Sequence, residues 1–368
     1  MSECCSGNAD EPPYDYSGPT PWVTGEIDTV RGPVPTVATN LTRTDHLGGY
    51  GVRWGIKRME YRVPPGLYAV GSPDDTAPVL VTANYKLTFD ALRRELTGVD
   101  AWILVLDTKG VNVWCAAGKG TFGTIEVVRR VLATDLAQVV SHRVLVLPQL
   151  GAPGVAAHDV RAATGFRVVY GPVRAADVPA FLSAGMKASS EMRLVTFTLR
   201  ERLVLAPVEL AAAFRPRPLL VAAAVMLLAG AGSWGYSLQA VAHRGVFTLD
   251  AAIAALLAGG VVTPVLLPWL PGRSFSLKGA TVGALAGLGT IVAVAALGIR
   301  PNMFGGAAIV LGVTAGASYI AMNFTGSTPF TSPSGVEHEM RRALPFQVGA
   351  GALAIVAWVI SAFVGVTP

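Results

Sequence analysis

The chain has 368 residues, of which 52% are hydrophobic and only 14% are charged. A soluble domain carries about 25% charged residues, so this composition excludes an ordinary soluble enzyme. The formal net charge of +5 is modest, and the sequence contains no Lys- or Arg-rich run of the kind that follows a phosphate backbone. A nucleic-acid-binding function is therefore disfavoured.

The charged residues are unevenly distributed along the chain. Only nine of the 29 basic and 24 acidic residues lie after residue 218, so we expect a soluble part followed by a membrane part. The opening sequence, MSECCSGNADEPPYDY, lacks both the basic start and the apolar stretch of a secretory signal peptide. We therefore expect the soluble part to be cytoplasmic.

Residues 1–60 contain Pro-rich stretches and the Gly-rich segment LGGYGVRWG, with little helical periodicity. This pattern predicts an irregular segment that packs onto the rest of the soluble part. Cys4 and Cys5 lie near its start, and thiolates prefer soft metal ions such as Hg(II). The pair is a candidate mercury site, and an incidental pair of cysteines is the alternative.

Residues 61–190 alternate between short apolar runs and amphipathic segments. The runs lie at 66–71, 78–84, 101–108, 143–150 and 166–172, and the amphipathic segments at 86–96, 122–136 and 154–165. This alternation predicts an α/β, Rossmann-like domain with a mostly parallel sheet. Ligands of such sheets bind at the carboxyl ends of the strands.

Small or polar residues follow several of the predicted strands. Those chosen as candidate ligand contacts, by position alone, are Thr82, Asn84, Gln149 and Gly171. Ordinary turn chemistry explains the same residues equally well.

The segment NVWCAAGK at 112–119, which follows the third predicted strand, is the most specific feature of the sequence. It is not a phosphate-binding P-loop, because Val113 and Gly120 occupy positions where that motif needs Gly and Ser or Thr. The dinucleotide fingerprint GxGxxG is also absent from this turn. Asn112 is a suitable helix cap, and the two alanines offer a smooth face for a broad, flat ligand.

The segment from Asn112 to Lys119 closely resembles the cap-helix signature of the corrinoid proteins of anaerobic mercury methylation, the HgcA family. The resemblance continues through PGLYAVGSP at 65–73, VLVTANYKLTFDALR at 79–93 and the Ser/Thr-rich TGSTPFTSPSGVEHEM. It implies a domain similar to that of the corrinoid iron–sulfur protein. Such a domain holds cobalamin or a related corrinoid, with Cys115 as the lower axial ligand of the cobalt.

The resemblance also implies which residues contact the cofactor. Besides Cys115 these are Asn112, Val113, Trp114, Ala116, Ala117, Gly118 and Lys119. Hg(II) is an electrophile and must receive a methyl group with its electron pair or as a radical. An anionic sulfur opposite the methyl group would stabilise the more oxidised cobalt that remains, much as thiolate ligation does in haem proteins. Cys115 is therefore the predicted catalytic residue.

Three cysteines cannot hold an iron–sulfur cluster in this chain, because a cluster normally takes four thiolates. Low-potential electrons must then come from another protein. The resemblance implies that this donor is HgcB, a ferredoxin-like protein with two 4Fe–4S clusters. It also implies methyltetrahydrofolate, or its methyl carrier, as the methyl donor and Hg(II) as the acceptor.

Residues 191–218 are predicted as a linker, and residues 219–368 as an all-α transmembrane domain. Apolar stretches near the roughly 20 residues that a membrane helix requires lie at 219–240, 247–270, 277–298, 303–323 and 346–366. Pro264 and Pro268 predict a kink in the second stretch. The polar residues 323–345 are expected to form a long loop, either solvated or a docking surface.

Basic residues in the connections predict the orientation of these stretches. Six lie on the side of the soluble part, Arg215, Arg217, Arg273, Lys278, Arg341 and Arg342, and two lie on the other side, Arg244 and Arg300. The positive-inside rule then places the protein in the inner (cell) membrane as a multi-pass protein with its C-terminus outside.

The leading hypothesis is a membrane-anchored corrinoid-dependent methyltransferase that converts Hg(II) to methylmercury. A corrinoid methyl carrier for another acceptor is one alternative. A membrane sensor or transport protein with a soluble ligand-binding domain is the other.

Overall fold

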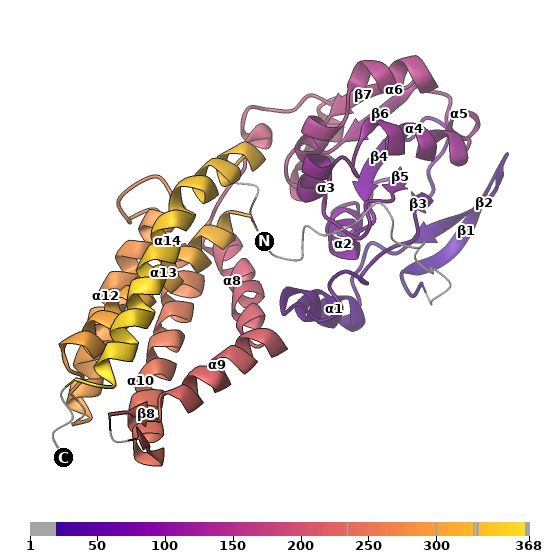
Figure 1. Ribbon diagram of the computed structural model, residues 1–368. Coiled ribbons are helices and arrows are strands. Elements are labelled where there is room, and N and C mark those ends of the chain that lie inside the picture. The colour runs from indigo at the N-terminus through magenta and orange to yellow at the C-terminus, as the bar shows by residue number, and fades with distance from the viewer. Residues whose placement is uncertain (1–19, 234, 299, 327, 329–330, 365–368) are drawn as a thin grey trace. The chain divides into compact units, whose positions relative to one another are not determined.

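The computed structural model describes residues 20–233, 235–298, 300–326, 328 and 331–364 (Figure 1). Cys4 and Cys5, the candidate mercury pair, lie outside the described residues. The chain divides into two compact units. The first comprises residues up to Thr196 apart from Arg53–Gly55, and the second comprises those three residues and the chain from Phe197 onward.

The first unit is built around a seven-stranded sheet in the order β1-β2-β3-β5-β4-β6-β7. The strands are β1 Val23–Thr29, β2 Gly32–Val37, β3 Gly66–Val70, β4 Val79–Ala83, β5 Ala101–Leu106, β6 Val144–Leu147 and β7 Arg167–Tyr170. Strands β4 to β7 are mutually parallel, whereas β3 runs antiparallel to β5 and β1 antiparallel to β2. The predicted α/β class is confirmed, with a sheet that is parallel-rich and mixed.

Helices of the first unit cover both faces of this sheet (Figure 1). They are α1 Arg43–Arg53, α2 Lys86–Arg94, α3 Val113–Lys119, α4 Thr124–Ala133, α5 Leu136–Val139, α6 Ala157–Thr164 and α7 Val178–Ser183, with short 3-10 helices η2 Gln149–Gly154, η3 Ala175–Asp177 and η4 Glu191–Arg193. Within β5, Leu104 packs in the core shared with α3, α4 and α6, whereas Ile103 packs in the core shared with α2 and α7. Burial on both faces explains why β4 and β5 are almost continuously apolar.

The described part of residues 1–60 is more regular than the sequence predicts. Strands β1 and β2 form a hairpin, and Thr36 of β2 pairs in parallel with Ala69 of β3, which extends the sheet. Gly32 allows the turn because its φ of +105° lies in the left-handed region. The prediction of an irregular segment is therefore wrong here, because β1 is an edge strand with mostly polar, exposed residues.

Four buried charges fasten α1 to α2. Lys86 Nζ lies 2.5 Å from Asp45 Oδ1 and 2.7 Å from Asp90 Oδ2. Arg93 contacts the same two carboxylates, with Nη2 2.9 Å from Asp45 and Nε 2.8 Å from Asp90. Each side chain is at most 5% exposed, so the cluster is held together without solvent. These contacts fix the position of α1 on the sheet.

Replacing Asp45 by asparagine is expected to lower the free energy of unfolding of the first unit by about 3–5 kcal/mol at neutral pH, because the buried Lys86 and Arg93 then share Asp90 as their counter-charge in this cluster. Denaturant unfolding of the full chain, with hydrogen exchange of the α1 and α2 amides, measures the change. Asp159→Asn is the control, since that side chain is 59% exposed. Equal stability of the two variants would contradict the prediction.

The Asp45 carboxylate also makes the stability of the first unit depend on pH in the acid range. Burial raises the pKa of Asp45, but hydrogen bonds from Lys86 and Thr42 outweigh burial, and the pKa lies well below its ordinary value of 3.8. The ionised group thus stabilises the fold above its unfolded-state pKa of about 3.9, and this contribution is lost as the pH falls through the depressed folded-state pKa. The stability difference between wild type and Asp45→Asn should therefore narrow below about pH 4.

The second unit is helical. Its elements are α8 Leu199–Ala213, α9 Pro216–Leu228, β8 Ala231–Gly232, β9 Gly235–Tyr236, α10 Leu238–Leu257, a π-helix Ala258–Val262, α11 Thr263–Leu266, α12 Phe275–Ala296, α13 Met303–Thr325 and α14 Pro333–Ser361. Four described helices are long and apolar enough to cross a membrane, namely Leu238–Leu266, Phe275–Ala296, Met303–Thr325 and Ser334–Ser361. The bent pair α8 and α9 meets at 58° and gives up to five spans.

The first predicted span, 219–240, is not one helix. Helix α9 ends at Leu228, and the β8–β9 hairpin follows, with Gly235 at a φ of +93°. Upstream, part of the predicted linker is the helix α8, which begins with a capping box formed by Thr198 and Glu201. Hydropathy alone missed the hairpin, because the glycines that break the helix are themselves compatible with an apolar stretch.

Two further expectations concern the membrane helices. The π-helix at Ala258–Val262 ends two residues before Pro264, so the helix leaves regular α geometry close to the predicted kink. The long loop predicted at 323–345 is shorter in the structure, because α14 begins at Pro333 with Ser332 as its N-cap.

Small residues allow α12 and α13 to approach closely. A Cβ atom on Gly283 would lie 2.9 Å from the Cα of Thr314, and one on Gly287 would lie 2.9 Å from the Cα of Val310. The close approach of helix backbones at such positions provides packing that lipid alone does not supply. Helix α13 also packs against α10 and α14, so it occupies the centre of the bundle.

Candidate functional site

Helix α3 carries the NVWCAAGK segment, and its two ends are defined by its sequence. Asn112 caps the N-terminus, as the sequence predicts, because its Oδ1 accepts a hydrogen bond from the Cys115 N–H at 2.9 Å. Gly120 ends the helix with a φ of +80°, and its N–H donates to the Ala117 carbonyl. The position of Cys115 is thus fixed by a side-chain cap at one end and a left-handed glycine at the other.

The two faces of α3 have different surroundings. Val113, Ala116 and Ala117 are buried in the core between the helix and the sheet. Trp114 and Cys115 are half-buried, and Gly118 is exposed, at spacings that place all three on the outer face. Lys119, the last residue of the helix, is half-buried. A ligand that approaches α3 therefore meets the tryptophan ring, the thiol and the bare glycine.

This arrangement corrects the prediction for the alanines. Ala116 and Ala117 were expected to form a flat surface under a ligand, but they are 0% and 5% exposed and face the core. The same correction applies to Val113, which is 6% exposed. Their small or compact side chains let α3 approach the sheet closely, so they support the site without facing a ligand.

The loop between β5 and α3 is organised by Asn84, at the end of the neighbouring strand β4. The Asn84 side chain is fully buried, and its Oδ1 accepts from the N–H groups of Thr108 and Gly110 at 3.1 and 3.0 Å. Its Nδ2 donates to Asp107 Oδ1 at 3.0 Å. Lys109 and Gly110 both have positive φ, so this loop needs such fixed partners.

Asn84 was predicted to contact a ligand, and the structure assigns it a different role. Its amide is used to hold the loop that leads into α3, so it positions Cys115 from within the protein. The sequence carried a signal for this role, since the ends of parallel neighbouring strands lie side by side and Asp107-Thr108 ends the strand next to Asn84. Asp107 and Thr108 also end a predicted strand, but they were not among the chosen ligand contacts, and the structure shows that they support the loop into α3.

The other strand-end candidates divide into two groups. Thr82 is 3% exposed, and because its neighbours Val81 and Ala83 face α3, it points to the opposite face of the sheet. Gly171 is buried, and its N–H donates to the Leu147 carbonyl at 2.8 Å. Neither lies where a ligand on α3 would be. Gln149 remains half-exposed, with its Oε1 2.8 Å from Arg193 Nη1.

Gln149 begins the 3-10 helix η2, and η2 lies directly against α3. A Cβ atom on Gly154 would lie 3.0 Å from the Cα of Ala117 and would collide with the Phe122 carbonyl oxygen. Only glycine permits this close approach. Helix α3, which follows β5, and η2, which follows β6, are thereby held side by side at the carboxyl edge of the sheet.

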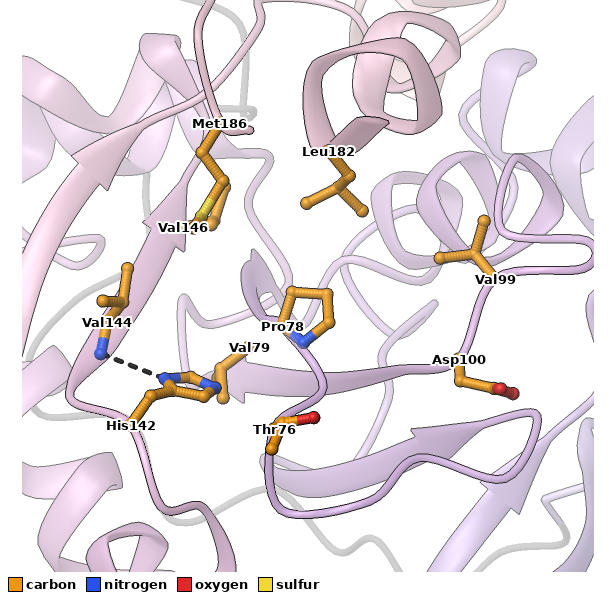
Figure 2. A pocket seen from close by; sticks show the side chains of 10 residues that line it. All are labelled: Thr76, Pro78, Val79, Val99, Asp100, His142, Val144, Val146, Leu182 and Met186. Atoms are coloured by element: carbon orange, nitrogen blue, oxygen red, sulfur yellow. Dashed lines mark hydrogen bonds between the residues drawn. The ribbon is translucent and has the colours of Figure 1, made fainter. Parts of the chain in front are cut away.

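A cavity of about 410 Å³ lies at the other edge of the sheet (Figure 2). His142 borders it, with Nδ1 accepting from the Val144 N–H at 3.2 Å and Nε2 2.9 Å from the Ala77 carbonyl oxygen. Val79 and Val144 begin their strands here, so this is the amino edge of the parallel strands. Ligands of such sheets bind at the carboxyl edge, which favours the α3 surface over this cavity.

The donor groups at the α3 surface suit one kind of metal centre. Among the described residues, no group of three or more His, Cys, Asp or Glu side chains is placed to hold a metal ion. A metal that brings its own equatorial ligands in a macrocycle needs only one further donor from the protein. Cys115, which is half-buried and packs partly against the core, can supply that donor, and sulfur prefers soft metals.

Comparison with known proteins places this surface in a family. Residues 57–182 match the sequence profile of CdhD, the CO dehydrogenase/acetyl-CoA synthase delta subunit. Residues 57–182 therefore form a CdhD-family domain. This CdhD-family domain includes β3 to β7, α3 and η2, so it contains every candidate site residue described above.

Curated relatives agree with this assignment. The acetyl-CoA decarbonylase/synthase complex subunit gamma of Methanopyrus kandleri is 41% identical over 128 residues, which are 34% of this chain and 27% of the relative. The corrinoid/iron-sulfur protein large subunit of Moorella thermoacetica is 29% identical over 131 residues, which are 35% of this chain and 29% of the relative. The chain spans less than a third of the length of these relatives, so the similarity covers one part of each.

Proposed function

We propose that the protein is a membrane-anchored corrinoid-dependent methyltransferase that methylates Hg(II) to methylmercury. The observation that carries this proposal is the half-exposed Cys115 on the outer face of α3, at the carboxyl edge of parallel strands in a CdhD-family domain. The resemblance of residues 112–119 to the mercury-methylation family supports the choice of substrate.

A corrinoid fits this surface on two grounds. One similar protein carries the cofactor in its name, as the corrinoid/iron-sulfur protein large subunit. The donor set is also suitable, since Cys115 offers a single soft sulfur and Gly118, on the same face of α3, is exposed and has no side chain. When bound, the corrinoid would supply a cobalt atom that carries the methyl group.

The residues of this chain have separate tasks in the proposed reaction. Cys115 would hold the corrinoid by donating sulfur electron density to its cobalt, and Trp114 would exclude water from the bound cofactor. Asn112 holds the first turn of α3 through its bond to the Cys115 N–H. Asn84 holds the preceding loop, so the thiol does not need to reorganise during the transfer.

The remaining parts of the proposal concern partners and location. The methyl group would come from methyltetrahydrofolate or its carrier, and Hg(II) would be the acceptor. A ferredoxin-like protein with two 4Fe–4S clusters would return electrons. The apolar helices of the second unit would anchor the chain in the inner membrane, with the CdhD-family domain in the cytoplasm and the C-terminus outside.

Two measurements on the full chain test this function. The visible spectrum of the purified protein should show strong corrinoid absorption, and membranes that contain the chain and its ferredoxin partner should convert labelled Hg(II) to methylmercury. A spectrum without corrinoid bands would exclude the cofactor. A corrinoid-loaded protein that methylates other acceptors but leaves Hg(II) unchanged would identify a methyl carrier of different specificity.

A further inference from the structure

A cavity of about 630 Å³ lies within the helical second unit, bordered by α9, α10, α13 and α14. All of its lining residues belong to this unit, and they are apolar or glycine apart from Arg244, Thr248 and Ser361. A Cβ atom on Gly312 would meet only the Cβ of Ala354, at an ordinary contact distance of 3.7 Å. The absence of a side chain at Gly312 therefore leaves open space for a ligand.

The cavity extends along two helices. On α10 its lining runs from Arg244 to Ala255, and on α13 from Gly305 to Gly316. Each stretch advances by eleven residues, which corresponds to about 16 Å of helix. This length is roughly half of the hydrocarbon layer of a bilayer, which is about 30 Å thick. The cavity thus has the length of one acyl chain in one leaflet.

Arg244 places a positive charge in the lining. Its Nη1 donates to the carbonyls of Ala229 and Ala231 at 3.0 and 2.8 Å, and its Nη2 donates to the Trp358 carbonyl at 3.0 Å. The guanidinium also lies 4.9 Å from the centre of the Trp358 ring. These bonds use three of the five N–H donors of an arginine. Within the part of the chain that the structure describes, two N–H groups are left for a ligand.

Acidic side chains do not border the cavity. Asp250 is on the same helix as Arg244 but lies outside the lining, and His243 and Arg300, which are near this end in sequence, are exposed and also outside it. The acidic residues of the second unit are Glu201, Glu209, Asp250, Glu337 and Glu339. A cation in a membrane helix that lacks a carboxylate partner among the described residues is a candidate contact for an anionic ligand.

The Arg244 end of the cavity lies near one end of the helix bundle. Helices α10 and α13 begin there and α14 ends there, and Asn302 Nδ2 donates to the Ser361 carbonyl at 3.1 Å. Lipid headgroups lie at the ends of membrane helices, where arginine side chains reach them. Leu228 and Ile355 line the cavity and are 60% and 64% exposed, so it opens to the outer surface of the bundle.

We propose that this cavity binds one acyl chain of an anionic phospholipid, with the lipid phosphate on the two remaining N–H groups of Arg244. The apolar lining covers the bound chain, and the open side lets the second chain stay in the bilayer. An arginine suits this role because its planar N–H groups match the oxygens of a phosphate. The inference requires the second unit to lie in a bilayer, but it does not depend on the corrinoid or on mercury.

Native mass spectrometry of the full chain tests the proposal. The protein is released from micelles of neutral detergent that contain phosphatidylglycerol or phosphatidylcholine, and the lipid that stays bound is measured. Wild type should retain one phosphatidylglycerol about fivefold more strongly than phosphatidylcholine, as expected for one cation at a lipid headgroup. Gly312→Leu should weaken retention about tenfold or more, because its side chain occupies the space of the acyl chain. Arg244→Gln should remove the preference for phosphatidylglycerol.

Gly289→Leu is the matched control. Gly289 is on α12 outside the cavity lining, and a Cβ atom there would have no heavy atom within 4 Å, so this variant should retain phosphatidylglycerol as wild type does. The two glycine variants decide the outcome without Arg244, whose bonds to three carbonyl groups also support the fold. Unchanged retention in Gly312→Leu, or equal retention of both lipids by wild type, would overturn the proposal. Retention of added palmitate in place of phosphatidylglycerol would overturn it too, by identifying a fatty-acid site.

Discussion

Replacing Cys115 by alanine is expected to abolish mercury methylation, with a loss of about 100-fold or more, which corresponds to about 2.7 kcal/mol of activation free energy. The reason is electronic, because the variant loses the anionic sulfur that would stabilise the more oxidised metal as the methyl group leaves. Conversion of labelled Hg(II) by membranes with the ferredoxin partner measures the effect. Cys115→His should be equally inactive if thiolate donation is what the reaction requires.

Folding is not expected to explain that loss. Cys115 is half-buried, and its helix is held by the Asn112 cap and by the buried alanines, so truncation should change the free energy of unfolding by about 1 kcal/mol or less. Ile125→Ala, which removes an exposed side chain from α4, serves as the control for a change on the surface of the same domain. X-ray absorption at the cobalt edge should show a sulfur neighbour in wild type and none in Cys115→Ala. Full activity of the alanine variant would refute the ligand role.

The central strands of the sheet were predictable because each is a nearly continuous apolar run. Strands β4 and β5 are buried on both faces, and burial on both faces leaves that signature in a single sequence. Strand β1 lacks it, since as an edge strand it keeps polar, exposed residues. Helix α1 was missed for a different reason. It contains three glycines and is held by Lys86 and Arg93, which lie far away in sequence.

The position of Cys115 was predictable, but the orientation of its helix was not. Asn112 and Gly120 define the ends of α3 by local rules that a sequence displays. The direction in which Ala116 and Ala117 face depends on how α3 packs on η2 and the sheet. Two alanines fit a ligand surface or a close helix contact equally well, so only tertiary packing could decide between them.

The role of the Asn84 side chain, like the orientation of α3, could not be decided from the sequence. A polar residue at a strand end is compatible with ligand binding and with loop support, and the sequence could not separate them. The structure separates these two roles, since both the Oδ1 and the Nδ2 atoms of Asn84 form hydrogen bonds of 3.1 Å or less with the loop from Asp107 to Gly110. The distinction has a measurable consequence.

Asn84→Ala is expected to lower the free energy of unfolding by about 2–4 kcal/mol, because the buried N–H groups of Thr108 and Gly110 and the Asp107 carboxylate lose their partner. Hydrogen exchange of the full chain should show faster exchange at these two amides and throughout α3. Corrinoid binding should weaken as a result. Thr82→Val is the matched control, since Thr82 is also buried in β4 but faces away from α3, and its change should be about 1 kcal/mol or less.

The variant Asn84→Asp distinguishes between two roles of this side chain, support of the loop into α3 and direct contact with a ligand. The new carboxylate at position 84 can still accept from Thr108 and Gly110, but it faces Asp107 where an N–H donated before. Adjacent carboxylates at the buried position 84 and the half-buried Asp107 raise the pKa of at least one of the two, so this variant should gain stability relative to wild type as the pH is lowered toward that raised pKa. Faster exchange of α3 amides at neutral pH that recovers in mild acid would support the positioning role. Weakened corrinoid binding with unchanged α3 exchange at every pH would instead show that Asn84 contacts the ligand directly.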